Sequence, residues 1–109
     1  MEFNEYQKES RKTAIYPDAG KNFLYPVLGI AGEAGEVADK VKKILREKEG
    51  VLDEISREDL KKELGDLLWY MSQLATEIGV SLDDVAQSNI KKTQSRMERG
   101  ALLGDGDNR

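Results

Sequence analysis

The sequence has 109 residues, the length of one small domain, and contains neither cysteine nor histidine. The lack of both residue types excludes disulfides, thiolate and imidazole catalysis and the usual zinc sites, so any metal must be held by oxygen ligands. The net charge of −4 gives no electrostatic reason to bind nucleic acid, and the absence of an apolar run of about 20 residues or a secretory signal predicts a cytoplasmic protein without a membrane span.

Two helices are predicted in the first half of the chain. The first runs from about Asn4 to Ile15 and stops before Pro17. The second starts in the region of residues 22–26 and continues to about Lys48, with Pro26 tolerable only in its opening turn and Gly50 after its end. Both are amphipathic, so each is expected to bury one face. The apolar stripe of the second consists of Val27, Ile30, Ala31, Ala34, Val37, Ala38, Val41, Ile44 and Leu45.

A third helix is predicted from Ser56, whose hydroxyl would cap it with Asp59 at the capping-box position, to about Ile78. Leu68 and Trp69 carry the apolar surface round to a second side, so this helix is expected to be central and to contact more than one neighbour. Its main apolar stripe consists of Leu60, Leu64, Leu67, Met71, Leu74 and Ile78.

The fourth predicted helix begins at Ser81, with Asp84 three residues on, and extends past Met97. Residues 100–109 form a glycine-rich tail that is expected to be flexible. Residues 1–109 are thus predicted to be a single all-α domain, a four-helix bundle with short connections. Because a domain of this size buries only about 60 to 70% of its unfolded surface, a homodimer or a dimer of dimers is expected.

Four carboxylates lie beside the apolar stripes of the two middle helices. Glu33 and Glu36 on the second helix, and Glu63 and Asp66 on the third, are each one helical turn apart. A partly buried carboxylate must be protonated, paired or bound to a cation, and two such pairs on facing helices would surround a hard divalent ion. The alternative is that all four acids pair with neighbouring lysines at the surface.

Each acidic pair has a glycine between its two acids, Gly35 in one and Gly65 in the other. A glycine inside a helix costs about 0.5 to 1 kcal/mol relative to alanine. We therefore expect a close approach at these positions, either by a neighbouring helix or by a bulky ligand.

The two acidic blocks resemble those of MazG-like, all-α nucleoside triphosphate pyrophosphohydrolases. That family has E-x-x-E followed at a distance by E-x-x-D, which reads here as Glu33-x-x-Glu36, 26 residues, then Glu63-x-x-Asp66. The segments LGIAGEAGEVADKVKK and KKELGDLLWYM carry the resemblance, with NEYQ, RKTA and the closing GDGDNR around them. It covers nearly the whole chain.

The resemblance implies a metal site and a reaction. Glu33, Glu36, Glu63 and Asp66 would bind Mg²⁺, with Mn²⁺ as a substitute, and the enzyme would hydrolyse a nucleoside triphosphate to the monophosphate and pyrophosphate. The expected substrate is a dNTP or a non-standard nucleotide, and the expected role is cleaning of the nucleotide pool. One of Glu33, Glu36 and Glu63 would also position the attacking water, and the sequence leaves open which.

Substrate contacts are expected from the fourth helix and the tail. Asn89, Lys92 and Arg96 fall on one helical stripe, where they would hold phosphate or sugar; a solvated basic face is the alternative. Arg109 would reach the phosphates if the tail closes as a lid, and a disordered terminus is the alternative.

Further candidates lie on the second helix or at its start. Lys40 and Lys43 are either phosphate ligands or surface charges. Phe23 and Tyr25, just ahead of the acids, are the aromatic residues best placed to meet a nucleobase. Trp69 points away from the main stripe of its helix, which favours a contact between subunits.

Two other functions remain open from the sequence alone. One is a phosphoribosyl-ATP pyrophosphatase, an enzyme of histidine synthesis that is similar to this fold. The other is a non-catalytic helical interaction module in which the acids form ion pairs across a dimer. A response to Mg²⁺ separates the second from both enzymes, because a ligand that binds only the folded state raises its stability.

Overall fold

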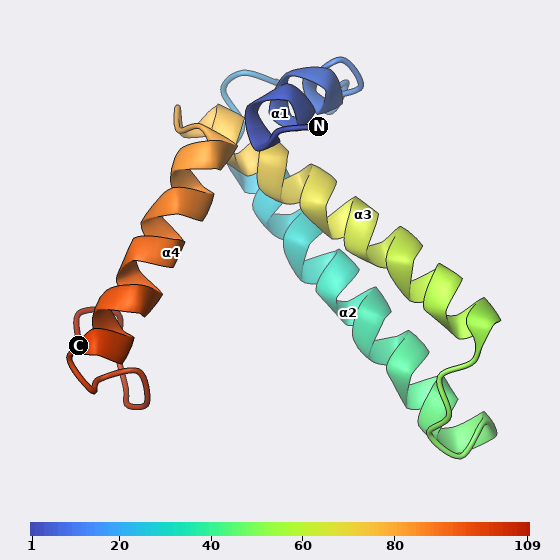
Figure 1. The fold of residues 1–109 in the computed structure, drawn as a ribbon. Helices are drawn as coiled ribbons and strands as arrows, with labels where there is room; N and C mark the ends of the chain where they lie inside the picture. Colours follow the sequence, from blue (N-terminus) through green and yellow to red (C-terminus); the bar gives the residue numbers. More distant parts are fainter.

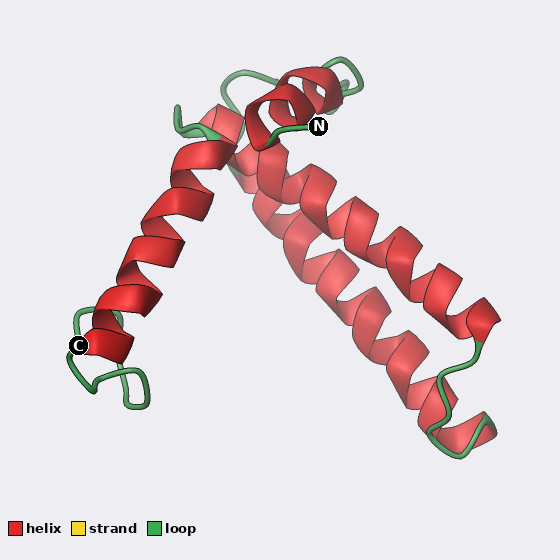
Figure 2. Ribbon diagram, in the orientation of Figure 1, coloured by secondary structure: helices red, strands yellow, loops and turns green.

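The computed structural model describes residues 1–109 and contains four helices and no strand (Figure 1, Figure 2). Their bounds are α1 Phe3–Arg11, α2 Leu24–Glu47, α3 Glu54–Glu77 and α4 Leu82–Glu98. The prediction of an all-α chain with four helices is confirmed. None of these helices combines the length and the apolar character needed to cross a membrane.

The helix starts show which capping predictions were right. Ser81 caps α4 as predicted, because its hydroxyl accepts a hydrogen bond from the N–H of Asp84 at 3.0 Å. The prediction that Ser56 caps α3 is wrong. Asp53 takes that place, with its carboxylate accepting from the N–H of Ser56 at 2.8 Å, so α3 starts three residues earlier. The hydroxyl of Ser56 instead accepts a hydrogen bond from Lys48.

The first helix ends at Arg11, before the predicted Ile15. After Arg11 the backbone tightens, and the N–H groups of Lys12 and Thr13 bond to the third residue back along the chain. The hydroxyl of Thr13 also donates to the carbonyl of Ser10 at 3.0 Å. The helix therefore closes early, and the chain turns toward α2.

The long helices α2 and α3 lie side by side and antiparallel, and α1 lies across the C-terminal end of α3 (Figure 1). Since α3 contacts α2 and α1, its predicted central position is confirmed. The contact between α1 and α3 is polar at its centre. Ser72 and Gln73 are fully buried there, and both hydrogen-bond to the hydroxyl of Ser10, at 2.9 and 3.0 Å.

Glu77, at the end of α3, fastens the connection between α1 and α2. Its buried carboxylate accepts hydrogen bonds from Arg11 at 2.8 Å, from the Tyr16 hydroxyl at 2.7 Å and from the backbone N–H groups of Gly20 and Asn22, each at 2.8 Å. Burial opposes ionisation of Glu77, but these donors outweigh it and lower its pKa to about 2. The connection between α1 and α2, which contains Tyr16 and Phe23, is thus held against α3.

The closest approach of α2 to α3 is at Gly29, where a Cβ atom would overlap the ring of Tyr70. The expectation for Gly35 and Gly65 is not met within the chain, since no neighbouring atom comes within 4 Å of a Cβ placed on either. The helix contact is set near the start of α2, one to two turns before the acids. The space beside Gly35 and Gly65 is open in the single chain.

Replacement of Gly29 with alanine is expected to lower the free energy of unfolding by about 1 to 3 kcal/mol, because the methyl group displaces Tyr70. Urea unfolding followed by circular dichroism measures this. Gly32→Ala, on the same helix, is the control, because its Cβ would meet no atom within 4 Å. That variant should be unchanged or more stable by up to about 1 kcal/mol. Equal stability of the two variants would contradict the close approach.

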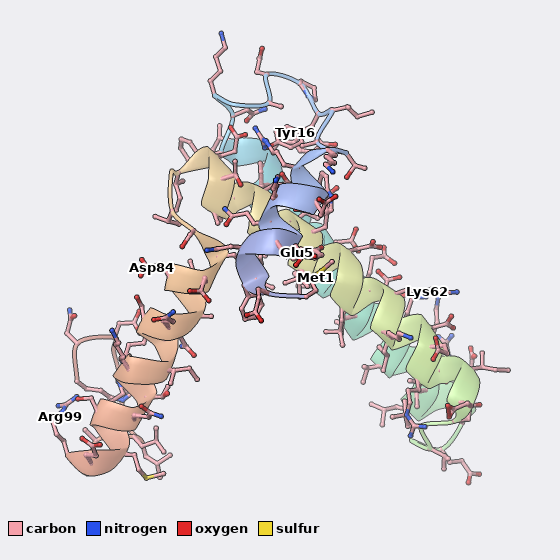
Figure 3. All side chains as sticks on the ribbon, turned by 45° about the horizontal axis from the view of Figure 1, so that its top comes forward. Met1, Glu5, Tyr16, Lys62, Asp84 and Arg99 are labelled. Atoms are coloured by element: carbon pink, nitrogen blue, oxygen red, sulfur yellow. The ribbon has the colours of Figure 1, made fainter.

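Much apolar surface stays exposed because α4 stands apart from α2 and α3, with Asp84 near its start and Arg99 at its end (Figure 3). The accessible area is 7881 Å², about 1,800 Å² more than that of a compact monomer of this mass. The radius of gyration is 16.8 Å, against about 13 Å for a compact chain of this length. Residues of the predicted stripes such as Leu64 and Leu45 are 58% and 66% exposed. One chain alone therefore does not close a four-helix bundle.

Candidate functional site

The structure brings three of the four predicted acids together between α2 and α3. Glu33 comes from α2, Glu63 and Asp66 come from α3, and one carboxylate oxygen of each lies within 4.8 Å of the others. Glu33 and Glu63 are half-buried, and Asp66 is exposed. These three residues are called the acidic cluster below. Because α2 and α3 lie antiparallel, the segment around Glu33 and the segment around Glu63 and Asp66 lie at the same height along the helix pair.

The fourth acid, Glu36, lies outside the acidic cluster. It is exposed, one turn beyond Glu33 on α2, and lines a neighbouring groove. Its charge still acts on Glu33. Burial raises the pKa of Glu33, and the nearby carboxylates of Glu63, Asp66 and Glu36 raise it further.

Positive charge at the acidic cluster is scarce. Lys40 is the single basic partner of the four acids, with its Nζ 3.4 Å from Oε1 of Glu63. Crowded carboxylate oxygens with one ammonium group among them form an oxygen-only donor set with an excess of negative charge. Such a set fits a hard divalent cation such as Mg²⁺ or Mn²⁺, which prefers carboxylate ligands and would supply the missing positive charge.

Aromatic side chains form one wall beside the acidic cluster. A hollow of about 240 Å³ is lined by Glu33, Asp66, Trp69 and Tyr70. The ring of Trp69 meets that of Tyr70 edge to face at 5.1 Å, and Tyr25 lies 6.4 Å from Tyr70. A flat base that entered the hollow would thus lie next to the carboxylates.

The aromatic predictions fare differently. Tyr25 stacks on Tyr16 at 4.9 Å and neighbours Tyr70 without lining the hollow itself, whereas Phe23 is 55% exposed and has no ring partner. Trp69 makes contacts within the chain, since its Nε1 donates to the hydroxyl of Thr13 at 2.9 Å. Sequence reasoning missed Tyr70, although its position four residues after Asp66 places both on one face of α3.

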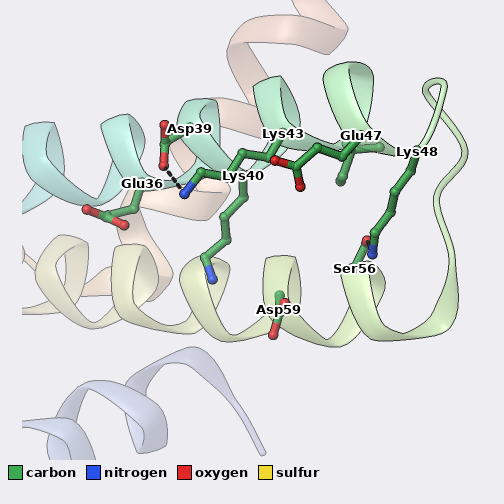
Figure 4. A pocket seen from close by; sticks show the side chains of 9 residues that line it. Glu36, Asp39, Lys40, Lys43, Glu47, Lys48, Ser56 and Asp59 are labelled. Atoms are coloured by element: carbon green, nitrogen blue, oxygen red, sulfur yellow. Dashed lines mark hydrogen bonds and ion pairs between the residues drawn. The ribbon is translucent and has the colours of Figure 1, made fainter.

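A groove of about 340 Å³ runs along α2 and α3 beyond Glu36 (Figure 4). Lys43 pairs with Asp39 at 3.0 Å, whereas Lys40 extends from α2 toward α3. The groove therefore carries both signs of charge and opens next to the acidic cluster. Its lining residues are Glu36, Asp39, Lys40, Lys43, Ile44, Glu47, Lys48, Ser56 and Asp59.

The predicted substrate residues on α4 lie away from the acidic cluster within one chain, because α4 diverges from α2 and α3 (Figure 1). Asn89 and Lys92 line a shallow hollow of their own on α4. Lys92 pairs with the carboxylate of Asp107 at 3.1 Å. Arg96 is buried, and it donates to the backbone carbonyl of Asp107 at 2.5 Å.

The tail folds back against the end of α4. Arg109 donates to the carbonyl oxygens of Ala101 and Leu102, at 3.1 and 2.9 Å, and Arg99 donates to the terminal residue at 2.7 Å. In this arrangement the guanidinium group of Arg109 holds the tail in its folded-back conformation. Its role at a substrate phosphate stays a prediction.

Comparisons with known proteins identify the family of this chain. The MazG nucleotide pyrophosphohydrolase domain matches residues 24–100, a span that contains all four acids. The "Gene 37 protein" of Mycobacterium phage L5 is 49% identical over 114 residues, and the similarity covers the full length of both chains. No solved structure matches the chain. The chain belongs to the MazG nucleotide pyrophosphohydrolase family.

Proposed function

We propose that the protein hydrolyses a nucleoside triphosphate, a dNTP or a non-standard nucleotide, to the monophosphate and pyrophosphate. The observation that carries this proposal is the acidic cluster, in which Glu33, Glu63 and Asp66 converge with Lys40 as their single basic partner. A triphosphate needs a divalent cation to offset its charge, and this cluster needs one too. We place its substrate in the nucleotide pool of the cytoplasm.

In the proposed mechanism, Glu33, Glu63 and Asp66 would hold the metal ion, which would supply charge compensation for the phosphates. Glu36 lies beside the cluster and keeps its oxygens free, so it accepts a proton from the attacking water. The water oxygen bonds to the α-phosphorus while the bond to the bridging oxygen breaks, and pyrophosphate leaves with that electron pair. No histidine or covalent intermediate is needed.

The remaining contacts come from the aromatic wall and from α4. Trp69 and Tyr70 border the hollow beside the acids and offer faces on which a base packs. Asn89 and Lys92 supply hydrogen bonds and positive charge to phosphate or sugar, and Arg96 joins them when the tail moves off its guanidinium group. Because α4 stands apart from the acids of its own chain, these three residues act on the site of a second copy.

We propose a homodimer, or a dimer of dimers, as the active form. The excess surface of about 1,800 Å² per chain exceeds the roughly 800 Å² that one partner buries in a standard interface. The excess area lies within the range of areas that each partner buries in obligate dimers, whose interfaces are apolar. The apolar residues left exposed on α2, α3 and α4 supply such a surface; among them are Leu28, Leu45, Leu64, Val85 and Ile90.

The assembly is tested by light scattering after size-exclusion chromatography. The expected mass is two or four times the chain mass of 12.2 kDa. A mass of one chain at micromolar concentration would remove the assembly from the proposal and leave the α4 residues without access to the acids.

The reaction is tested by pyrophosphate release from a panel of normal and modified nucleotides, with Mg²⁺, with Mn²⁺ and with a chelator. We expect release from at least one dNTP or modified nucleotide, and its loss with the chelator. Phosphoribosyl-ATP belongs in the panel, because exclusive cleavage of it would replace the proposed substrate class. No release from any member, together with no effect of Mg²⁺ on thermal stability, would identify an interaction module instead.

A further inference from the structure

Lys40 occupies a position between the acidic cluster and the groove. It lies one turn after Glu36 on α2, and its side chain extends toward α3 (Figure 4), where its ammonium group lies 3.4 Å from Oε1 of Glu63. The side chain of Lys40 is 32% exposed and that of Glu63 is 14% exposed, so the pair lies at the boundary between protein and solvent. The same lysine lines the groove.

The pair between Lys40 and Glu63 is loose. Its two atoms are 3.4 Å apart, and Lys40 donates no hydrogen bond to any acceptor in the chain. The other groove lysines are better matched: Lys43 lies 3.0 Å from Asp39, and Lys48 donates to Asp53 and to Ser56 at 2.9 Å. Of the three, Lys40 is therefore the one whose ammonium group is readily displaced.

A divalent cation on the acidic cluster would change the charges around Lys40. Glu63 belongs to the cluster, so an ammonium group 3.4 Å from its oxygen would stand close to a doubly positive ion. Like charges at such a distance repel, most strongly where water is partly excluded. The four-carbon side chain of lysine is flexible, and the groove of about 340 Å³ is the space next to it.

We propose that Lys40 exchanges partners when the metal arrives: it neutralises Glu63 in the metal-free protein and turns into the groove to bind the β- and γ-phosphates once the metal is in place. This inference rests on the proposed function and assigns the groove between α2 and α3 as the subsite of the leaving pyrophosphate. The ammonium group is a compact charge with three donors, suited to a phosphate chain whose negative charge increases as the bond breaks.

The exchange makes two opposite predictions for Lys40→Met, and Lys43→Met is the matched control for the first of them. Without nucleotide, Lys40→Met should bind Mn²⁺ about 3- to 10-fold more tightly than the wild type, because no ammonium group competes for Glu63. With Mn²⁺ at saturation, it should bind pyrophosphate about 10-fold more weakly. Paramagnetic resonance of free Mn²⁺ measures the first quantity, and titration calorimetry measures the second.

Lys43 lines the same groove but pairs with Asp39, so Lys43→Met should change Mn²⁺ affinity by less than about 2-fold. Lys40→Arg keeps the charge and should retain most of the pyrophosphate affinity. Should the methionine variant not fold, Lys40→Gln replaces it in both measurements.

The outcomes separate the two proposals. If the wild-type protein does not bind Mn²⁺, the proposed function itself fails. If the wild type binds Mn²⁺ but Lys40→Met behaves like Lys43→Met, or loses Mn²⁺ affinity, the partner exchange is overturned while the metal site stands. Tighter Mn²⁺ binding together with weaker pyrophosphate binding supports the exchange.

Discussion

Glu63→Gln is expected to lower the rate of pyrophosphate release on the order of 10³-fold while the protein stays folded. The amide removes one of the three negative charges in the acidic cluster and leaves Glu33 and Asp66 as the carboxylates of the proposed metal site. Lys40 loses its partner, but its side chain is 32% exposed and water solvates it. A continuous pyrophosphate assay and a thermal melt, run on the same preparation, measure both effects.

The control for this variant is Glu58→Gln on the same helix. Glu58 is 55% exposed and pairs at the surface with Lys61 at 3.6 Å, so its loss should change the rate by less than about 2-fold. A Glu63→Gln protein that keeps a tenth or more of the wild-type rate would show that Glu63 is not a metal ligand in the active enzyme.

Glu77→Gln is expected to lower the free energy of unfolding by about 3 kcal/mol. The carboxylate is fully buried and accepts hydrogen bonds from Arg11, from Tyr16 and from two backbone N–H groups. A glutamine side chain cannot ionise, and its NH₂ group would face partners that are themselves hydrogen-bond donors, so it would lack an acceptor. Denaturant unfolding at neutral pH measures the loss, which is a large fraction of the stability of a small domain.

The same residue predicts a pH dependence. The pKa of Glu77 is lowered from 4.5 to about 2 on folding, so its contribution to stability is complete above the unfolded value and is lost as the pH falls toward 2. The difference between wild type and Glu77→Gln should therefore shrink between pH 4.5 and pH 2. A constant difference across this range would contradict the lowered pKa.

An exposed ion pair provides the comparison for Glu77. Glu9 pairs with Lys12 at 2.7 Å on the surface of α1, and its side chain is 47% exposed. Glu9→Gln should change the free energy of unfolding by less than about 1 kcal/mol, since exposed pairs contribute little.

The helices and the meeting of the acids could be predicted from the sequence because both depend on local rules. Helical spacing places Glu33 beside the apolar stripe of α2, and the same spacing places Glu63 on α3. Capping is local too, and Ser81 was identified correctly. The error at Ser56 arose because Asp53 is an equally good cap three residues earlier, and the sequence does not rank two strong caps so close together.

What could not be predicted depends on the register between helices. Sequence spacing gives the face of a helix but not the level at which its neighbour meets it. Thus Gly29 rather than Gly35 lies under the ring of Tyr70, and Lys40 pairs with Glu63 across the helix pair. The role of Glu77 was missed for the same reason, since its donors come from the end of α1 and the loop that follows it, 55 to 66 residues away in sequence.

The predicted apolar stripes are correct as patterns, but a pattern does not say what covers it. Leu64 belongs to the predicted stripe of α3, and Leu45 to that of α2, yet both are mostly exposed in the single chain. The direction of α4 decides this, because its main contacts are with α1 and not with the long helices.

The small buried core has a thermodynamic consequence for anyone who handles this protein. Tyr16, Ala75 and Leu82 are the apolar residues of its core other than a proline, so an isolated chain gains little from removing hydrocarbon from water. In the proposed dimer, folding would be linked to self-association by mass action, and the melting temperature should rise with protein concentration. Specific activity at nanomolar enzyme would report how much of the sample is assembled as well as how fast it turns over.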